Sequence, residues 1–197
     1  MTDLEAAYAL IDDANARDPN LVSAYGASVP AELIYGQRMT AMLARVYPDA
    51  SDDVRLAVRA QHIRRWEVPR ASYPMDRPGY LRWRKDLGRK HAEWAGEILH
   101  SLGIGADQVT RVGALIRKEN FRRDAEAQAV EDTAALVFLA HYAEDFAAKH
   151  PADKVVSILV KTLAKMSDEG KAAALTLDLS APVRGALEAA LAAGSGP

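Results

Sequence analysis

Cysteine and long apolar runs are both missing from this sequence. Without cysteine the chain has neither disulfide bonds nor thiolate chemistry, so a metal ion would need His, Asp, Glu or water as ligands. No stretch approaches the roughly 20 apolar residues that a membrane-spanning helix needs. The first residues, MTDLEAAYALIDDANARD, carry acids where a secretory signal carries a basic segment and an apolar run. These absences predict a cytoplasmic protein with no membrane partner.

An excess of charge of one sign is also missing. The 25 basic and 27 acidic residues give a formal net charge of −2, so no overall field would draw the chain to nucleic acid. The sequence contains no glycine-rich phosphate loop, nucleophile elbow, zinc motif or calcium loop. Function therefore has to be inferred from the positions of individual polar residues.

Apolar residues recur at helical spacing through nearly the whole chain, and no segment shows a convincing strand pattern. Ser51, Asp107, Asp124 and Ser180 stand where helix N-caps are expected. The pattern predicts an all-α, single-domain helical bundle over residues 1–193, followed by a disordered tail at 194–197. The predicted helices cover residues 4–14, 30–46, 51–66, 78–102, 107–120, 124–149, 151–166, a short segment after Ser167, and 180–193.

One long connection interrupts this helical pattern. Pro69, Pro74 and Pro78 rule out a regular helix between Glu67 and Gly79. Loops of this length in compact domains are more often functional than simple connections. We therefore expect residues 67–79 to act as a lid over a site, and the aromatic residues around it would allow either a monomer or a homodimer.

Polar residues fall on three helical faces that otherwise carry apolar residues. His91 shares a stripe with Leu87, Ala95 and Leu99, and Asp132 lies within an alanine- and leucine-rich face. Burying such groups without partners is costly, so they should meet one another, a ligand or a metal ion. Each residue alone is more often a satisfied core residue, but together they predict a shared polar pocket. Its members would be Gln61, His62, Arg65, His91, Gln128, Glu131 and Asp132.

A local excess of arginine and aromatic residues surrounds the proline-rich loop. Arginine side chains suit planar anions such as phosphate and carboxylate. The alternative is a solvated face on which arginine stacks on tryptophan. Lys118 is either a surface lysine or an anion contact, whereas Lys161 and Lys165 are expected on the solvated side of a helix. The candidate substrate-binding residues are Trp66, Arg70, Tyr73 and Arg84 in this cluster, together with Gln61, Arg65 and Gln128 from the polar pocket.

The run AVRAQHIRRWEVPRASYPMDRPGYLRWRKDL, with HAEWAGEIL, LIRKEN and EAQAVEDTAALVFL after it, resembles a family known as domain of unknown function 4202. The resemblance extends over roughly residues 3–190 and implies no established activity. The order of the segments is more distantly similar to the HD-domain superfamily of helical, metal-dependent phosphohydrolases. That similarity implies an HD-domain-like bundle.

The HD-domain superfamily has an early histidine, a His-Asp doublet, one or two further histidines and a late aspartate. Here the doublet falls at His62-Ile63, the later histidines at His91 and Lys118, and the aspartate at Asp132. The early position falls between Tyr35 and Arg38, where there is no histidine. The resemblance thus leaves His62, His91 and Asp132 as ligands for at most one divalent transition metal ion. A metal-free pocket, in which Lys118 and Arg65 supply the positive charge, is equally open.

Two functions follow from these residues. In the first, an HD-like hydrolase or lyase acts on a small phosphorylated or carboxylated molecule. Its catalytic groups would be His62, His91, Lys118, Glu131 and Asp132. In the second, a catalytically degenerate domain keeps the pocket to bind an anion or nucleotide in a regulatory role.

Overall fold

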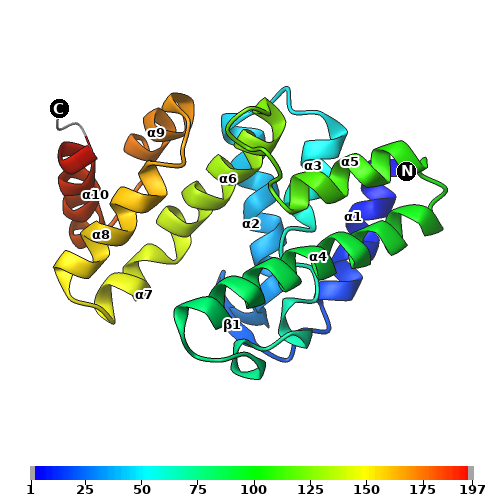
Figure 1. Cartoon of the computed structure of the whole chain (residues 1–197), viewed down its shortest axis with the longest axis horizontal. Helices are drawn as coiled ribbons and strands as arrows, with labels where there is room; N and C mark the ends of the chain where they lie inside the picture. Colours follow the sequence, from blue (N-terminus) through cyan, green and yellow to red (C-terminus); the bar gives the residue numbers. More distant parts are fainter. Residues whose placement is uncertain (1–2, 195–197) are drawn as a thin grey trace.

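The computed structural model describes residues 3–194, and it confirms the all-α class (Figure 1). Two strands and short 3-10 turns at Arg65–Glu67 and Arg70–Ser72 accompany the helices. The elements are α1 (Asp3–Asn15), β1 (Leu21–Ala24), β2 (Ala27–Pro30), α2 (Ala31–Val46), α3 (Asp52–Arg59), α4 (Arg77–Ser101), α5 (Ala106–Ile116), α6 (Ala125–His141), α7 (Ala143–Ala148), α8 (Ala152–Leu163), α9 (Asp168–Leu175) and α10 (Ala181–Gly194).

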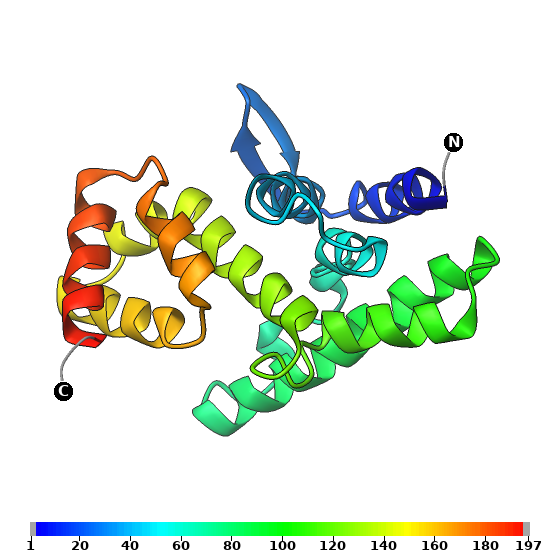
Figure 2. The same cartoon turned by 90° about the horizontal axis from the view of Figure 1, so that it is seen from above.

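Helix α6 lies between two groups of helices. Helices α1 to α5 lie on one side of it, with α4 and α5 packed against each other (Figure 1). Helices α7 to α10 lie on the other side, as the view from above also shows (Figure 2). Within the described part of the chain, no helix is both long and apolar enough to cross a membrane.

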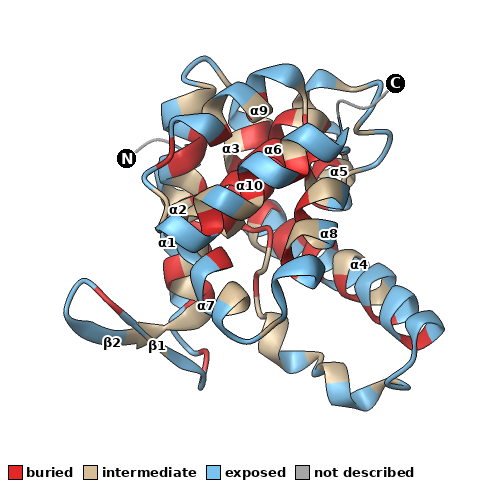
Figure 3. Cartoon of the chain, turned by 90° about the vertical axis from the view of Figure 1, so that its left-hand side faces the viewer, coloured by how far each residue is buried: buried red, intermediate tan, exposed pale blue. Residues whose placement is uncertain are grey.

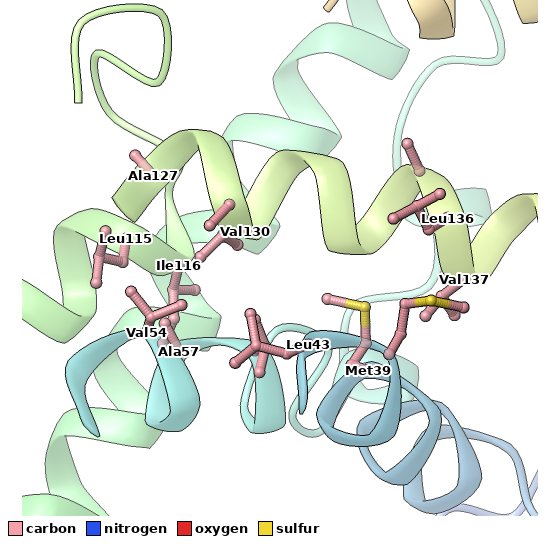
Figure 4. Packing of buried hydrophobic residues seen from close by; sticks show 14 of the residues in the cluster. Met39, Leu43, Val54, Ala57, Leu115, Ile116, Ala127, Val130, Leu136 and Val137 are labelled. Carbon is pink, nitrogen blue, oxygen red and sulfur yellow. The ribbon is translucent and has the colours of Figure 1, made fainter. Parts of the chain in front are cut away.

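The hydrophobic core includes residues from both halves of α6 and continues into the C-terminal helices. Side chains of α2, α3 and α5 face those of α6 across it (Figure 4). Each fully buried Leu, Ile, Val or Met stabilises the fold by about 1.5–3 kcal/mol relative to an exposed position. The residues labelled in that view are Met39, Leu43, Val54, Ala57, Leu115, Ile116, Ala127, Val130, Leu136 and Val137.

The structure contains a β-hairpin that the sequence analysis did not predict. Strands β1 and β2 pair antiparallel, with Ala24 opposite Ala27. Tyr25 and Gly26 form the two-residue turn, and both have positive φ, at 53° and 77°. The hairpin extends from the molecule with its residues largely exposed (Figure 3). Strands of four residues with no alternating apolar pattern give too weak a signal to be recognised.

Three predicted helices end earlier than expected because the backbone leaves the helical region. Helix α3 stops at Arg59, and Arg64 then has a φ of 52°. Helix α5 stops at Ile116, and Lys118 and Asn120 have φ values of 54° and 52°. Helix α6 ends at His141, so residues 143–148 form the separate helix α7. The segments that follow α3 and α5 are therefore irregular, and both contribute to the site described below.

Two of the four predicted N-caps are confirmed. Ser51 accepts a hydrogen bond from the backbone of Val54, and Asp124 accepts two from the first turn of α6. Asp107 lies inside α5, whose N-cap is Gly105, and the buried hydroxyl of Ser180 has no hydrogen-bond partner within residues 3–194. At the C-terminus α10 includes Gly194, which was expected in the disordered tail, and residues 195–197 lie outside the described residues.

Candidate functional site

A cleft of about 470 Å³ opens between α4, α6, α8 and the irregular segments after α3 and α5. Basic side chains outnumber acidic ones on its walls, where Glu131 is the acid. The basic residues are Arg65, Arg84, Arg117, Lys118 and Lys165. The other lining residues of interest are Gln61, His62, Trp83 and His91. The cleft is thus suited to an anion.

His62 lies in the cleft and is held by a carboxylate from α2. Its Nδ1 is 3.2 Å from Oε2 of Glu32, and its ring stacks on Tyr35 with the centroids 3.9 Å apart. Burial lowers the pKa of His62 by more than the contact with Glu32 raises it, so the pKa lies below the ordinary histidine value. Because Nδ1 faces a carboxylate, it carries the hydrogen of the neutral ring, and Nε2 keeps its lone pair.

Glu32 is itself buried and charged. Burial raises its pKa, but the hydrogen bond from His62 and the nearby Arg65 outweigh that effect and bring the pKa below its ordinary value. Nη1 of Arg65 lies 3.5 Å from the other carboxylate oxygen of Glu32. A carboxylate that orients a neutral imidazole is the arrangement of a general base in many enzymes.

Asn15, the last residue of α1, joins the two segments that carry this pair. Its Nδ2 donates to the carbonyl oxygen of Glu32 at 3.3 Å, and its Oδ1 accepts from the backbone of Arg64 at 3.0 Å. Oδ2 of Asp18 accepts a further bond from the Glu32 backbone at 3.0 Å. Asn15 and Asp18 are both buried. These contacts fix the start of α2 relative to the loop that carries His62.

His91 is the second histidine of the cleft. Its Nδ1 lies 2.6 Å from the carbonyl oxygen of Ile63, and its ring centroid is 5.9 Å from that of His62. Burial, together with the neighbouring His62, lowers the pKa of His91 to about 3, so the ring is neutral at physiological pH. The predicted meeting of His62 and His91 in one pocket is therefore present.

Lys118 and Glu131 form an ion pair in the wall of the cleft. Lys118 Nζ lies 2.8 Å from Glu131 Oε2, and Lys165 Nζ lies 3.6 Å from the other oxygen. Burial raises the pKa of Glu131, but the positive charge of Lys118 outweighs it and holds the pKa low. Burial lowers the pKa of Lys118, with Glu131 acting against that shift. Arg84 stands nearby and makes no ion pair within the described residues.

A smaller cavity of about 310 Å³ adjoins the cleft. His62, Arg65, Ala134 and Phe138 line both spaces. The remaining walls of the smaller cavity come from Ala31, Glu32, Tyr35 and Tyr142. His62 is therefore positioned between the cation-rich cleft and a smaller cavity that is lined by aromatic rings and by Glu32.

Asp132 does not join the two histidines. It is completely buried, and its carboxylate accepts hydrogen bonds from Tyr47 at 2.8 Å, from Gln128 at 3.0 Å, and from the backbone and hydroxyl of Ser167 at 3.0 and 2.6 Å. Gln128, expected to contact substrate, instead bonds to Asp132 and to the Lys165 carbonyl oxygen. Both residues attach α6 to the N-terminal end of α9.

The metal ligand set expected from the HD-domain resemblance is therefore not assembled. The Nδ1 bonds of His62 and His91 leave both Nε2 atoms free, as in many metal-bound histidines. The third expected ligand, Asp132, is occupied elsewhere by Tyr47 and Ser167. Among residues 3–194, no group of three or more His, Asp or Glu side chains is placed to hold a metal ion.

Three further predicted residues lie outside the cleft, around the proline-rich loop. Arg70 donates to the carbonyl oxygens of Tyr73, Pro74 and Asp76, and the Tyr73 hydroxyl donates to Asp86 at 3.1 Å. Trp66 belongs to the 3-10 turn that precedes the loop and does not line the cleft. Arg70 and Tyr73 thus hold the loop in one conformation, whereas an anion contact was expected of them.

Glu32 and Lys165 are among the site residues that were not identified from the sequence. Glu32 lies on the buried face of α2 with Gly36, Met39 and Leu43, at spacings of four, three and four residues. That periodicity was a usable signal, but an acid in the first turn of a helix is also common on exposed surfaces. Lys165 follows α8 and was expected on its solvated side, but the chain turns there and brings it to Glu131.

The structure defines the protein as an all-α domain whose cation-rich cleft is lined by a histidine, and a carboxylate behind that histidine holds its ring. The chain belongs to the family described as domain of unknown function (DUF4202), whose model matches residues 5–187. The match covers the predicted family motifs and every cleft residue named above. Neither a curated protein nor a solved structure shows significant similarity to the chain.

Proposed function

We propose that the cleft binds a small phosphorylated or carboxylated molecule and that His62 acts on it as a general base. The observation that carries this proposal is the contact of Glu32 with His62, because the ring of His62 lines a cleft whose charged side chains are mostly basic. The proposal includes a cytoplasmic monomer or homodimer that acts without nucleic acid or a membrane.

Hydrolysis is the reaction that this site favours. Neutral His62 removes a proton from a water molecule, and the water oxygen forms a bond to the phosphorus or carbonyl carbon of the substrate. The bond from that atom to the leaving oxygen breaks, and the leaving oxygen takes the proton from the imidazolium. Arg84, Lys118 and Lys165 stabilise the negative charge that develops on the substrate. In a lyase reaction the same base would remove a proton from carbon, the C–H electron pair would form a double bond, and a leaving group would depart from the neighbouring carbon with its bonding pair.

The similarity to HD-domain phosphohydrolases supports hydrolysis of a phosphoester in particular. The superfamily's first histidine corresponds to the region that begins at Tyr35, and Tyr35 stacks on His62. Because Asp132 is bonded to Tyr47 and Ser167, we assign no step to a metal ion. In our proposal the positive charge comes from Lys118 and its neighbours.

The first test measures phosphate binding by thermal shift and calorimetry. Inorganic phosphate should raise the melting temperature of the wild type, and Arg84→Ala and Lys118→Met should each weaken its binding by about tenfold or more. Arg82→Ala is the matched control, since Arg82 is exposed on the same helix and does not line the cleft. Equal phosphate binding in all four proteins would show that the anion does not bind in this cleft.

The second test measures turnover with a panel of phosphomonoesters and carboxylic esters. His62→Gln should abolish turnover while phosphate binding persists, and Glu32→Gln should lower kcat. Unchanged turnover in His62→Gln would show that His62 is not the general base.

The alternative function is a binding module that holds an anion without acting on it. The use of Asp132 as a structural group favours this alternative, because a catalytic HD-domain site relies on such an aspartate as a metal ligand. Tight binding of a phosphorylated molecule, with no turnover of any phosphomonoester or carboxylic ester in the panel, would support this alternative function.

A further inference from the structure

Two residues that line the cleft each have a buried polar atom without a hydrogen-bond partner among the described residues. These atoms are Oε1 of Gln61 and Nε2 of His91. The two residues are 7% and 2% exposed. Buried polar atoms in proteins are almost always paired with protein, water or ligand atoms. We therefore infer that a molecule bound in the cleft supplies the missing hydrogen-bond partners of these two atoms.

Both atoms are hydrogen-bond acceptors. A carbonyl oxygen can only accept, so Nδ1 of His91 donates to Ile63 at 2.6 Å and the neutral ring leaves a lone pair on Nε2. Gln61 donates from Nε2 to the carbonyl oxygen of Ile116 at 3.1 Å, which fixes the amide and leaves Oε1 as the acceptor. Neither atom can bind a phosphate or carboxylate oxygen directly.

The cleft thus offers two kinds of contact. Arg65, Arg84, Lys118 and Lys165 are donors suited to an anionic group. Gln61 and His91 need donors such as a hydroxyl or an amino group. A simple anion satisfies the first set and leaves the second without partners.

We propose that the ligand of the cleft combines an anionic group with at least one hydroxyl or amino group that donates to Gln61 or His91. This inference rests on the proposed function, because it takes the anion to bind at the same basic residues. It favours phosphorylated polyols, sugars and amino alcohols over inorganic phosphate, pyrophosphate and alkyl phosphates.

Calorimetry with two matched pairs of ligands tests the inference. Glycerol 1-phosphate is compared with propyl phosphate, and phosphoethanolamine with ethyl phosphate. In the wild type the donor-bearing member of at least one pair should bind about tenfold more tightly, the effect of one hydrogen bond to a buried acceptor.

Two variants assign the preference to the proposed atoms. His91→Asn keeps a donor for the carbonyl oxygen of Ile63 and removes Nε2, and Gln61→Met removes Oε1 at nearly constant volume. At least one variant should abolish the preference within the pair, whereas Arg84→Ala should weaken both members equally. Because the two substitutions are independent, failure of one variant to fold leaves the other as the test.

The outcomes separate this inference from the proposed function. If both members of each pair bind equally well and Arg84→Ala still weakens them, the anion site stands and the requirement for a donor is overturned. If the preference persists in both variants, the donor binds elsewhere and the inference is likewise overturned. If neither phosphate nor any of the four ligands binds, the proposed function is overturned together with the inference.

Discussion

Glu32 and His62 meet across 30 residues of sequence, with the carboxylate 3.2 Å from Nδ1 of the imidazole. The contact selects one neutral tautomer, and Asn15 fixes the backbone on both sides of it. A base whose tautomer is set before substrate arrives needs no reorganisation at the moment of reaction.

The first prediction concerns this pair. Glu32→Gln removes the negative charge that raises the pKa of His62, so the pKa should fall further below the histidine value. Long-range ¹H–¹⁵N NMR spectra of the two imidazole nitrogens, recorded as a function of pH, measure both the pKa and the tautomer. Glu67→Gln, which alters an exposed acid near the same loop, should leave the His62 titration unchanged. A His62 pKa that rises in Glu32→Gln would contradict the orienting role of Glu32.

The second prediction concerns Asp132 as a structural residue. Asp132→Ala should lower the free energy of unfolding by about 3 kcal/mol or more, because Tyr47, Gln128 and Ser167 lose a buried acceptor. Urea denaturation measures the change. Asp178→Ala, at an exposed acid between α9 and α10, should be nearly neutral. If Asp132→Ala were as stable as the wild type, the carboxylate would have no structural role.

The third prediction concerns two glycines with opposite expected effects. A Cβ atom on Gly170 would lie 2.6 Å from Cγ of Asp132, whereas one on Gly185 would meet no atom within 4 Å. Gly170→Ala should therefore destabilise the protein by about 2 kcal/mol or more. Gly185→Ala, inside α10, should stabilise it by about 0.5–1 kcal/mol. Melting temperatures that shift in the same direction would contradict the packing of α9 on α6.

The fourth prediction concerns pH. Below pH 6.5 an unfolded His91 takes up a proton, while the folded residue stays neutral down to about pH 3. The unfolded state therefore binds more protons, and stability should fall by up to about 1.4 kcal/mol for each pH unit below 6.5. His62 and His141, whose pKa values are also lowered by burial, add to this slope.

Urea denaturation between pH 7 and pH 5 measures this effect above the range in which carboxylates titrate. His91→Asn should have a shallower dependence on pH than the wild type, and His100→Asn, at an exposed histidine, should match the wild type. The same slope in all three proteins would show that His91 is not buried as a neutral residue.

The fifth prediction concerns metal removal. Because Asp132 is bonded to Tyr47 and Ser167, EDTA should change neither the melting temperature nor phosphate binding. Metal analysis of the purified protein provides an independent readout. A stoichiometric metal ion that is lost in His62→Ala, with a fall in melting temperature, would restore the ligand set implied by the HD-domain resemblance.

The sequence predicted the parts of this molecule that depend on local pattern. The spacing of His91 with Leu87, Ala95 and Leu99 placed it on a buried face, where the structure has it. The same reasoning placed Asp132 in the core, and that too is confirmed. Helical periodicity indicates which residues are buried because it depends only on neighbours within one helix.

The partners of those buried residues could not be predicted in the same way. Asp132 reaches Tyr47 and Ser167, which lie 85 and 35 positions away in the chain. Nothing in a single sequence distinguishes that arrangement from a contact with His62. Lys118 and Arg64 show a second limit of prediction from sequence. Each adopts a left-handed backbone conformation, which is uncommon for lysine and arginine and therefore cannot be predicted from the residue type. The irregular segments that carry the cleft residues were consequently predicted as helix.

The contact between α6 and α9 also has a consequence for how the family diverges. Asp132, Ser167 and Gly170 fit one another so closely that a change at any one of them disturbs the other two. We therefore expect these three positions to be inherited together across relatives. Arg84 forms no ion pair among the described residues, so we expect it to vary independently of these three positions if it contacts the ligand that we propose. An alignment of relatives would then distinguish positions that preserve the packing of α9 on α6 from positions that vary with the proposed ligand.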